Sequence, residues 1–533
     1  MLKSSGIQRS ELFSKPNLST WILFILVIAA VVMELTAIVL NLNTSLRLDE
    51  SQQLWASTKT IPGILSYIAR DVHVPLYAVL SHLVIQIFGN NVIYVRLLST
   101  IFFIFSIPAV YKMAQTTATK KIAFITTLLY FLSPFLTWYG TEARMYSLFT
   151  LITIVTHYLF IKLLNSNFSQ YIIWYIATGV IGIYTHYFFG LVILFQLIYL
   201  FFYQLSQYED ELQTDQFAKE RVGWKLDWAA FKSTWPAMIK FSKMLAVVAL
   251  SFLPWALYVM SQGSSANTKP LLTPPTTYNF LQIFVHFFSG FQTTSTEAVL
   301  ISIWPLVVIF LFFSFSKRKK QRITHTSYYL LLTFGPIILT MILSYLYRPL
   351  LVSRYLIFIT PSLFYLLALL IDQFSKPLFT ATIGLILVGT VIFQYQQSVY
   401  KNIAEKEDYR AVSEYLSTHI SNESVITVSA PFTIYPIEYY YQGHAKIETI
   451  PYWNRYTPTG IPPYSEAELQ QQLETYSQIY ESIVLVLSYD QGYEEEIKTY
   501  MRNNFELVEQ KDFSPGLELY EYRLPLSYLD EGW

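Results

Sequence analysis

The segment after the first hydrophobic run begins Leu46-Arg47-Leu48-Asp49-Glu50-Ser51 and ends Arg70-Asp71-Val72-His73-Val74-Pro75-Leu76-Tyr77. It places an adjacent carboxylate pair and an Asp-x-His motif directly after the apolar residues 21–42. A charged side chain at the centre of a bilayer costs about 3 kcal/mol even on lenient insertion scales. These residues therefore need water or a water-filled cavity, and we expect the rest of the chain to build that cavity.

The composition is that of a protein that crosses a membrane many times. Of the 533 residues, 53% are hydrophobic and only 14% are charged, whereas a soluble domain carries about 25% charged residues. The formal net charge is zero, so nothing points to a nucleic-acid partner. The chain contains no Cys, which excludes disulfides, thiolate nucleophiles and thiolate metal sites.

The hydrophobic runs predict a polytopic α-helical membrane protein with about eleven transmembrane helices, because a straight span needs about 20 apolar residues. The first run is long enough to span and no small-residue cleavage site follows it, so we expect an uncleaved span. Residues 75–88 are too few to span, and we expect an interfacial or re-entrant helix there. The expected spans are 21–42, 93–114, 122–138, 145–164, 171–184, 187–205, 239–260, 298–316, 326–345, 355–371 and 378–397.

Loop charges predict the orientation, because basic residues concentrate in cytoplasmic loops. Leaving 75–88 out of the membrane places the N-terminus, with Lys3, Arg9 and Lys15, and the later basic groups in the cytoplasm: Lys120-Lys121, Lys219, Arg221, Lys225 and residues 317–322. The polar clusters then face outward, in loops 43–92, 139–144, 261–297 and 346–354. The charged segment 206–238 predicts a cytoplasmic amphipathic connector.

We expect two domains, a transmembrane domain over 1–398 with a catalytic first outer loop 43–92, and an extracytoplasmic α/β domain over 399–533. Past residue 398 charged residues become frequent. The β-branched runs 425–428 and 483–487 alternate with helix-like stretches at 405–416, 466–480 and 493–503, and such alternation is typical of a small α/β domain. Its glycines are isolated, so no phosphate loop is present.

Several polar clusters have both a structural and a functional interpretation. Asp49-Glu50 could cap a solvated loop or supply a general base. Glu142 and Arg144 could belong to an interfacial belt, or Arg144 could hold a phosphate with its fork of donors. His186, between aromatic residues, is more often a structural residue than a ligand. A cationic site for an anionic lipid headgroup explains best the arginines of the outward segment, Arg348 and Arg354.

No metal-ligand spacing is present in the sequence. Asp71 and His73 stand two residues apart and no His-x-x-x-His occurs, so the motifs that hold zinc are missing. Asp49 and Glu50 could take a hard divalent ion, which nothing else supports. We therefore expect that no cofactor is required.

Taken in order, these motifs resemble the polytopic, lipid-carrier-dependent glycosyltransferases of the C-type fold. The bacterial branch related to protein O-mannosyltransferases, aminoarabinose transferases and rhizobial galacturonosyltransferases is the most similar. The resemblance covers the whole membrane part and, more loosely, the C-terminal domain, although Val74 stands where relatives usually carry proline. The matching pieces are Leu48-Asp49-Glu50, Asp71 to Tyr77, Arg96-Leu97, Ser133-Pro134, Glu142 to Tyr146, Tyr184 to Tyr187 and Ser353 to Pro361.

The resemblance implies an inverting hexosyl- or pentosyltransferase in a bacterial plasma membrane. It would move a sugar from a polyprenyl-phosphate carrier to a hydroxyl of a glycan, lipid or protein on the outer side, with no nucleic acid involved. The implied catalytic residues are Asp49, as base, and Glu50 beside it. The implied donor-phosphate ligands are Arg354, Arg144 and His73. The residues implied to bind the acceptor or to support the site are Glu142, Asp71, His186, Tyr187 and Tyr77.

Three other functions remain open from the sequence. A polytopic transporter or flippase of a lipid-linked glycan would place ionisable residues inside spans, and Glu34, within 21–42, favours it. A polymerase or ligase using a pyrophosphate-linked glycan should show large outward loops rich in arginine. A non-catalytic sensor would use its C-terminal domain to bind sugar.

Overall fold

The computed structural model describes residues 18–71, 73–165, 170–214, 228–262, 274–316, 325–400, 403, 406–456, 461–488 and 493–525. Several basic residues used above to predict the orientation lie outside the described residues: Lys3, Arg9, Lys15, Lys219, Arg221, Lys225 and residues 317–322.

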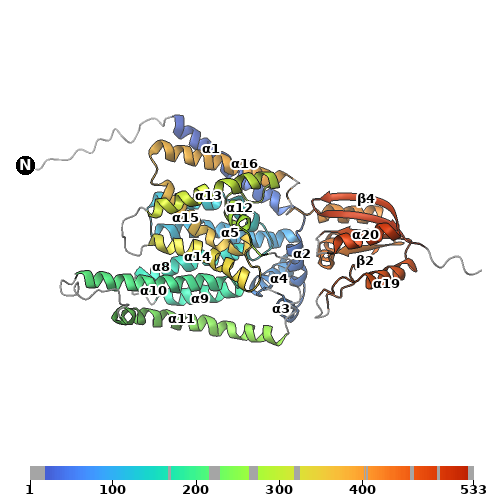
Figure 1. The fold of residues 1–533 in the computed structure, drawn as a ribbon, viewed down its shortest axis with the longest axis horizontal. Coiled ribbons are helices and arrows are strands. Elements are labelled where there is room, and N and C mark those ends of the chain that lie inside the picture. The colour runs from blue at the N-terminus through green and yellow to red at the C-terminus, as the bar shows by residue number, and fades with distance from the viewer. Residues whose placement is uncertain are drawn as a thin grey trace, which may run out of the picture.

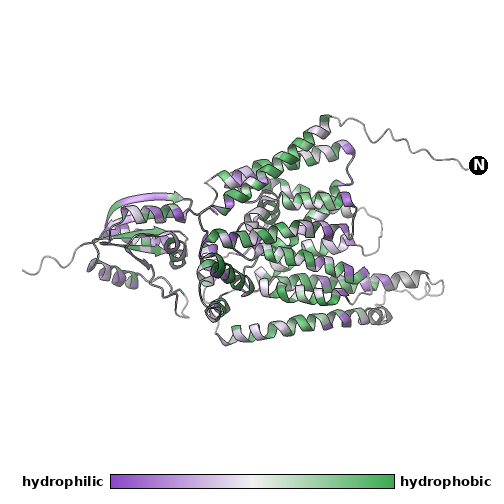
Figure 2. Cartoon of the chain, turned by 180° about the vertical axis from the view of Figure 1, so that it is seen from behind, coloured by the Kyte–Doolittle hydropathy of each residue, from purple (hydrophilic) through white to green (hydrophobic). Residues whose placement is uncertain are grey.

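Long helices run roughly side by side to form a helical part, and a smaller unit with a β-sheet lies at one end of it (Figure 1). Hydrophobic residues dominate the helical part and hydrophilic ones are more frequent in the smaller unit (Figure 2). The long helices of the helical part are α1 (Leu18–Leu42), α5 (Val92–Gln115), α8 (Tyr146–Asn165), α9 (Gln170–Thr185), α10 (Phe189–Thr214), α11 (Trp228–Ser261), α13 (Thr294–Ser316), α14 (His325–Leu346), α15 (Thr360–Ile371) and α16 (Lys376–Val399).

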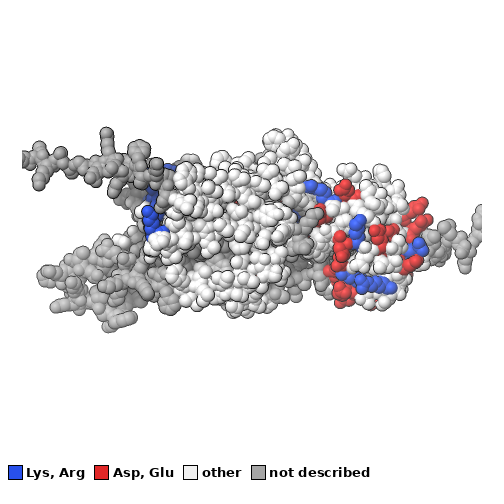
Figure 3. Space-filling model, turned by 90° about the horizontal axis from the view of Figure 1, so that it is seen from above, with Lys and Arg blue, Asp and Glu red and all other residues white. Residues whose placement is uncertain are grey.

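The outer surface of the helical part is apolar. Side chains such as Ile173 and Leu385 are exposed over 73% and 74% of their surface. On the face shown in Figure 3, a broad uncharged belt separates a group of Lys and Arg residues from the charged smaller unit. Such an apolar, uncharged helix surface is stable only when lipid or protein covers it. The expectation of a multi-pass membrane protein is therefore confirmed.

Among the described residues, eight helical segments are long and apolar enough to cross a membrane, or up to ten if two bent pairs each count as one span. The bent pairs are α6 (Lys120–Phe131) with α7 (Pro134–Gly140), at 62°, and α12 (Thr277–Ser289) with Thr294–Phe310 of α13, at 106°. When each bent pair counts as one span, ten of the about eleven expected spans meet this criterion. The other is 171–184, which corresponds to α9, described over 16 residues.

Two local predictions about the spans need correction. The expected continuous span 122–138 breaks before Pro134, because proline cannot donate within a helix and Ser133 caps a new helix by accepting from Leu136 N at 3.3 Å. The expected loop 261–297 contains α12, whose second half is buried. In contrast, residues 76–88 form the 13-residue helix α4 (Leu76–Phe88), which is too short to span, as expected.

Short helices gather at the end of the helical part that faces the smaller unit (Figure 1). They are α2 (Leu48–Ser57), α3 (Ile61–Arg70) and α4. Helix α2 begins after Arg47, whose backbone N–H donates to the Glu50 carboxylate at 3.1 Å, and such an acceptor satisfies a free N–H of the first turn. The 3-10 helix η2 (Ser353–Ile359) leads into α15.

The smaller unit is a five-stranded sheet in the order β2-β1-β3-β5-β4, with β2, β1 and β3 parallel and the β4–β5 hairpin antiparallel. One face packs on residues of α17 and α18, and the other on residues of α19 and α20. Strands covered on both faces are buried along their length, as all six residues of β1 are and as β3 is from Ile483 to Leu487. The elements are α17 (Tyr409–His419), β1 (Ser424–Ser429), η3 (Pro431–Thr433), α18 (Ile434–Tyr440), β2 (Lys446–Thr449), α19 (Glu466–Ser477), β3 (Ser482–Leu487), α20 (Glu494–Asn504), β4 (Glu506–Ser514) and β5 (Leu517–Arg523).

The orientation inferred from loop charges leads to a labelling prediction. Thr58, after α2, and Ser375, between α15 and α16, are both exposed, and α15 runs from the α2 end to the opposite end. In this naturally Cys-free chain, Thr58→Cys should react with a membrane-impermeant maleimide added to intact cells. Ser375→Cys should react only after permeabilisation. The reverse pattern would show that the predicted orientation is inverted.

Candidate active site

The end of α1 and the start of α2 are held by one buried arginine, Arg96 of α5. Its Nη1 donates to the carbonyls of Leu42 and Thr44 at 3.1 and 2.8 Å, and its Nη2 to the carbonyl of Ser45 at 3.0 Å. The last carbonyls of a helix have no partner within it and carry partial negative charge. The Arg96 guanidinium supplies both the donors and the opposite charge, so it fixes the turn between the first span and α2.

Glu50 completes this arrangement and has no exposed surface. Its two oxygens accept from Arg96 Nε and Nη2 at 2.9 and 2.5 Å, and one also accepts from Ala143 N at 2.8 Å. Although burial alone would raise it, the charge of Arg96 lowers the pKa of Glu50 to about 2. Both carboxylate oxygens of Glu50 are thus occupied by donors of the protein itself. The geometry therefore favours a positioning role for Glu50 over the predicted catalytic one.

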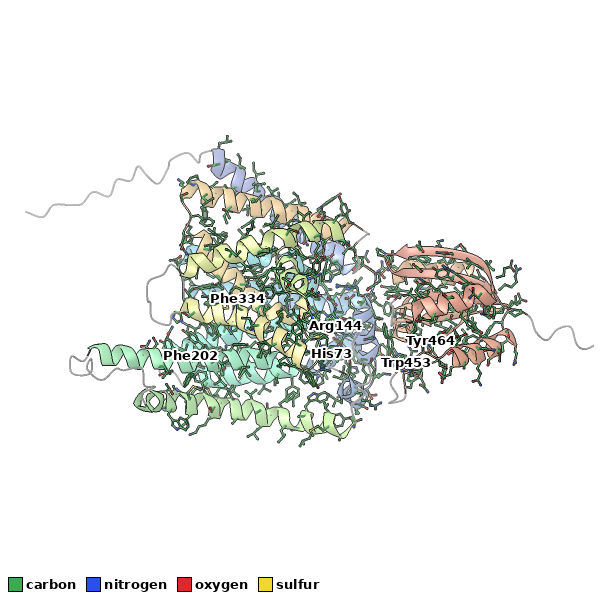
Figure 4. All side chains as sticks on the ribbon, in the orientation of Figure 1. His73, Arg144, Phe202, Phe334, Trp453 and Tyr464 are labelled. Atoms are coloured by element: carbon green, nitrogen blue, oxygen red, sulfur yellow. The ribbon has the colours of Figure 1, made fainter. Side chains whose placement is uncertain are left out.

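Asp49, the neighbour of Glu50, points to a different set of residues. Its carboxylate lies 3.8 Å from Arg144 Nη2 and 3.6 Å from Arg354 Nη2, and its side chain is one-third exposed. Arg144 also donates to the Asp49 carbonyl at 3.0 Å and to His73 Nε2 at 3.1 Å. Figure 4 shows His73 and Arg144 close together at the end of the helical part nearest the smaller unit. Four of the predicted residues thus converge from distant parts of the sequence.

The charges at this point make Asp49 strongly acidic. Burial alone would raise its pKa, but the guanidinium of Arg144, followed by that of Arg354, lowers the pKa of the carboxyl to about 2. Burial lowers the pKa of His73, and a neutral ring is what Arg144 needs if Nε2 is to accept its hydrogen bond. The site therefore combines an ionised aspartate with a neutral histidine.

Both arginines keep buried donors unused. The Nε atoms of Arg144 and Arg354 and the hydroxyl of Tyr146 are buried without a hydrogen-bond partner in the described structure. Most buried polar groups in proteins are satisfied, and an exception calls for a ligand or water. The unused donors lie around Asp49, where an anion with several oxygens would satisfy them.

Arg354 is placed by a polar relay that the sequence motifs did not reveal. Ser353 Oγ and His286 Nδ1 are 2.9 Å apart, and His286 Nε2 lies 3.2 Å from the Glu297 carboxylate. The relay ties η2 to α12 and α13. It fixes the backbone immediately before Arg354 and explains why the bent pair α12–α13 lies against this end of the structure.

Glu142 lies beside the same cluster but is paired differently. Its carboxylate accepts from Arg47 Nη1 at 3.1 Å, and the Arg47 guanidinium stacks on Trp138, 4.0 Å from the ring centroid. Burial, reinforced by Glu50, raises the pKa of Glu142 to about 7 even though Arg47 lowers it. Glu142 therefore changes charge near neutral pH, whereas Asp49 does not.

The other predicted residues surround this centre or support it. Tyr187 donates to the carbonyl of His73 at 3.2 Å, and Asp71 lies 3.8 Å from His73 Nε2. His186 stacks on Phe149 at 4.7 Å, and burial lowers its pKa to about 3. Tyr77 is buried and hydrogen-bonds Ser99 at 2.6 Å, so it joins α4 to α5 rather than facing the centre.

Two further observations bear on the open alternatives. Glu34 is fully buried and accepts a hydrogen bond from Thr137, so the residue that favoured transport is anchored to α7. Within the described ranges, no group of three His, Asp or Glu side chains is placed to hold a metal ion.

The comparisons with known proteins fit this architecture. A sequence model of the family described as dolichyl-phosphate-mannose-protein mannosyltransferase (PMT_2) matches residues 72–209, which include His73 and Arg144. ArnT from Cupriavidus metallidurans bound to undecaprenyl phosphate superposes with a TM-score of 0.54 at 10% identity, over 96% of this chain and 99% of that one. The apo state of the same protein superposes with a TM-score of 0.56 at 10% identity, over 94% of this chain and 98% of that one. The chain has the C-type glycosyltransferase fold.

This finding confirms the resemblance drawn from the motifs, at the level of fold. The oligosaccharyltransferase of Archaeoglobus fulgidus tethered with an acceptor peptide also matches, with a TM-score of 0.49 at 13% identity, over 87% of this chain and 69% of that one. No curated protein sequence matches the chain.

The Arg96–Glu50 pair predicts a large loss of stability on mutation. Glu50→Ala leaves a buried arginine without its counter-ion, and breaking such a pair costs about 3–5 kcal/mol. The matched control is Lys121→Ala, because Lys121 pairs with Asp372 at 2.9 Å but is 57% exposed, and exposed pairs contribute about 0–1 kcal/mol. Thermal unfolding in detergent should show a large decrease for Glu50→Ala and almost none for the control. Equal melting temperatures would contradict the positioning role.

Proposed function

We propose that the protein is an inverting glycosyltransferase that moves a sugar from a polyprenyl-phosphate carrier to an acceptor hydroxyl. The observation that carries this proposal is the Asp49 carboxylate, 3.8 and 3.6 Å from two arginines that keep unused donors. An anion-binding site next to a carboxylate base is what transfer from a phosphate-linked sugar needs. The family match and the fold shared with ArnT support the same reaction class.

The donor phosphate would sit against Arg144 and Arg354. A guanidinium presents donors in a fork that matches phosphate oxygens, and the free Nε atoms of both residues supply additional donors. Neutral His73 orients Arg144 by accepting its hydrogen bond. The solved relative bound to undecaprenyl phosphate shows that this fold accommodates such a carrier in that protein.

The transfer step is a single displacement at the anomeric carbon. The acceptor oxygen forms a bond to that carbon while the carbon–oxygen bond to the phosphate breaks, and the bonding electrons stay on the phosphate oxygen. Asp49 takes the acceptor proton as the new bond forms. The arginines stabilise the second negative charge on the leaving phosphate, which is the main electrostatic demand of the step. One displacement without an enzyme nucleophile inverts the configuration.

Donor binding itself would activate the base. The arginines hold the pKa of Asp49 at about 2 against the effect of burial, which makes it a weak proton acceptor. A phosphate that draws Arg144 and Arg354 towards its own oxygens removes part of the charge that depresses this pKa. Asp49 then becomes more basic only when a donor is present, so the proton transfer is coupled to occupancy of the site.

The proposed reaction takes place on the outer side of the plasma membrane. The candidate site lies at the end of the helical part next to the smaller unit (Figure 4), and the loop charges favour an orientation with that end outside. The lipid tail of the donor would lie in the adjacent leaflet. The acceptor would be a glycan, lipid or protein hydroxyl of the cell envelope.

The role of Asp49 is tested by Asp49→Asn, which preserves shape and removes the base. Transfer should fall by at least about 100-fold, the usual lower range for loss of a general base. Binding of polyprenyl phosphate should persist or strengthen, because the arginines lose a competing carboxylate. The control is Asp372→Asn, at the opposite end of α15, which should leave transfer unchanged. Turnover by Asp49→Asn near the wild-type rate would end the assignment.

Glu142 leads to a pH prediction. Its pKa of about 7 means that it is mainly neutral below that pH and charged above it. A charged Glu142 adds negative charge beside Arg144, where the leaving phosphate gains its second charge. Transfer should therefore decline as pH rises through about 7. Asp49, whose pKa the arginines hold at about 2, is ionised throughout.

The matched variant is Glu142→Gln, whose pH profile should be flat between about pH 6 and 8. Glu423→Gln, at an exposed position of the smaller unit, should keep the wild-type profile. The same decline in Glu142→Gln as in the wild type would assign the titration to another group.

A further inference from the structure

An aromatic–cation cluster lies where the smaller unit meets α2 and α3. We define it as the rings of Trp55, Tyr67, Tyr435 and Tyr456 with the cations of Lys59 and Arg455. The Tyr67, Tyr435 and Tyr456 rings lie 5.3, 4.8 and 5.9 Å from that of Trp55. Two rings come from the helical part and two from the smaller unit, so the cluster forms only when both are in place.

One carboxylate, that of Glu438, lies beside the two cations of the cluster. Lys59 Nζ lies 3.5 Å from the Trp55 centroid and Arg455 Cζ lies 5.3 Å from it. Glu438 accepts from Arg455 Nη2 at 2.7 and 2.6 Å, whereas no described carboxylate lies within ion-pair distance of Lys59. Two like charges on the same ring repel each other. An additional anion would neutralise the excess charge.

One donor of the cluster is buried and unused. Arg455 Nη1 has no hydrogen-bond partner in the described structure, and the Arg455 side chain is only 10% exposed. Tyr456, in contact with the same cations, is 70% exposed. A ligand can therefore reach the cluster from the Tyr456 side, and Arg455 can bind it without first losing another contact.

Domain packing alone does not explain these charges. The smaller unit is already held to the helical part by Tyr440, whose hydroxyl accepts from Leu46 N at 2.9 Å, and by Arg410, which donates to the Thr44 carbonyl at 3.2 Å. Aromatic residues and arginine are common at protein interfaces, but lysine is depleted there. Lys59, which has no described carboxylate within ion-pair distance, is therefore the cation that interface packing explains least.

We propose that this cluster binds the acceptor, and that the acceptor is a saccharide with an anionic group, either a carboxylate or a phosphate. The inference rests on the proposed function. The apolar face of a sugar ring packs on aromatic rings, and the anionic group pairs with Arg455 and Lys59. A few convergent polar groups on an aromatic surface are the usual design of a ligand site.

The cluster is placed to deliver an acceptor to Asp49. Trp55 and Asp49 belong to the same helix, about 9 Å apart along its axis. Tyr67 hydrogen-bonds Tyr435 and interacts electrostatically with Asp71 and Arg144. In Figure 4, Trp453, which contacts the Tyr435 ring at 6.1 Å, lies at the edge of the smaller unit nearest to Arg144. A short oligosaccharide is long enough to cover the distance of about 9 Å between Trp55 and Asp49.

The test measures binding of defined saccharides to the full chain in phosphatidylcholine nanodiscs by isothermal titration calorimetry. The acidic probe is a tetrasaccharide of alternating glucuronic acid and N-acetylglucosamine, and the neutral probe is N-acetylglucosamine tetrasaccharide. Glucose 6-phosphate, glucose and inorganic phosphate test the phosphate source. An acidic probe should bind at least tenfold more tightly than its neutral counterpart. Comparison of the glucuronic acid tetrasaccharide with glucose 6-phosphate, each relative to its neutral counterpart, then shows whether a carboxylate or a phosphate is preferred.

Matched variants assign the binding to the cluster. Arg455→Gln should weaken the acidic probe at least fivefold, whereas Arg523→Gln, another salt-bridged arginine of the smaller unit, should have no effect. Tyr456→Ala should weaken all saccharide probes. Tyr452→Ala, 61% exposed and three residues before Arg455, serves as its control. Thermal unfolding of each variant shows whether it is folded.

Three outcomes would overturn the inference. They are equal affinity for acidic and neutral saccharides, no saccharide binding, or an affinity for inorganic phosphate equal to that for glucose 6-phosphate. Binding of the acidic probe by Asp49→Asn should be no weaker than in the wild type, because the substitution removes a negative charge and leaves the cluster unchanged. Loss of transfer in Asp49→Asn with no saccharide binding would therefore reject the cluster and leave the proposed function standing.

Discussion

The buried ion pair between Arg96 and Glu50 is the constraint on which the candidate site depends. Arg96 donates hydrogen bonds to carbonyls at and just after the end of α1 and to both oxygens of Glu50. Glu50 in turn accepts from Ala143 N, the residue before Arg144. Three segments are therefore fixed by one guanidinium and one carboxylate. A buried pair of this kind adds little net stability over an apolar one, but it determines where its neighbours point, and those neighbours are Asp49 and Arg144.

The two adjacent carboxylates illustrate how environment separates chemical roles. Glu50 has no exposed surface and its oxygens are occupied by donors. Asp49 is partly exposed and interacts with its arginines at 3.6 and 3.8 Å, beyond hydrogen-bond distance. Such loose contacts leave room for a phosphate between the charges. The buried Arg96–Glu50 pair, with its short hydrogen bonds, organises the site. The longer contacts of Asp49 with Arg144 and Arg354 leave these three side chains available for a substrate.

The sequence was sufficient for the fold class and for the residues that converge, but not for how they pair. Asp49, His73, Arg144 and Arg354 stand out because a charge beside an apolar span is costly. Adjacent helical residues point about 100° apart, so the choice between Asp49 and Glu50 depends on where α5 packs. The relay from Ser353 to His286 joins residues 67 positions apart, and no local pattern reports that contact. The edge strand β4 was missed because its residues are largely exposed and charged.

The smaller unit has a physical reason to be part of the machinery. The segment between α1 and α2 is held from one side by Arg96 and from the other by Tyr440 and Arg410 of the smaller unit. Asp49 follows that segment directly. Displacement of the unit would remove the second set of hydrogen bonds and loosen the backbone that orients Asp49. A ligand bound at the contact between the two parts strengthens that contact. In the proposed function, acceptor binding and the orientation of Asp49 would thereby be linked through the same few hydrogen bonds.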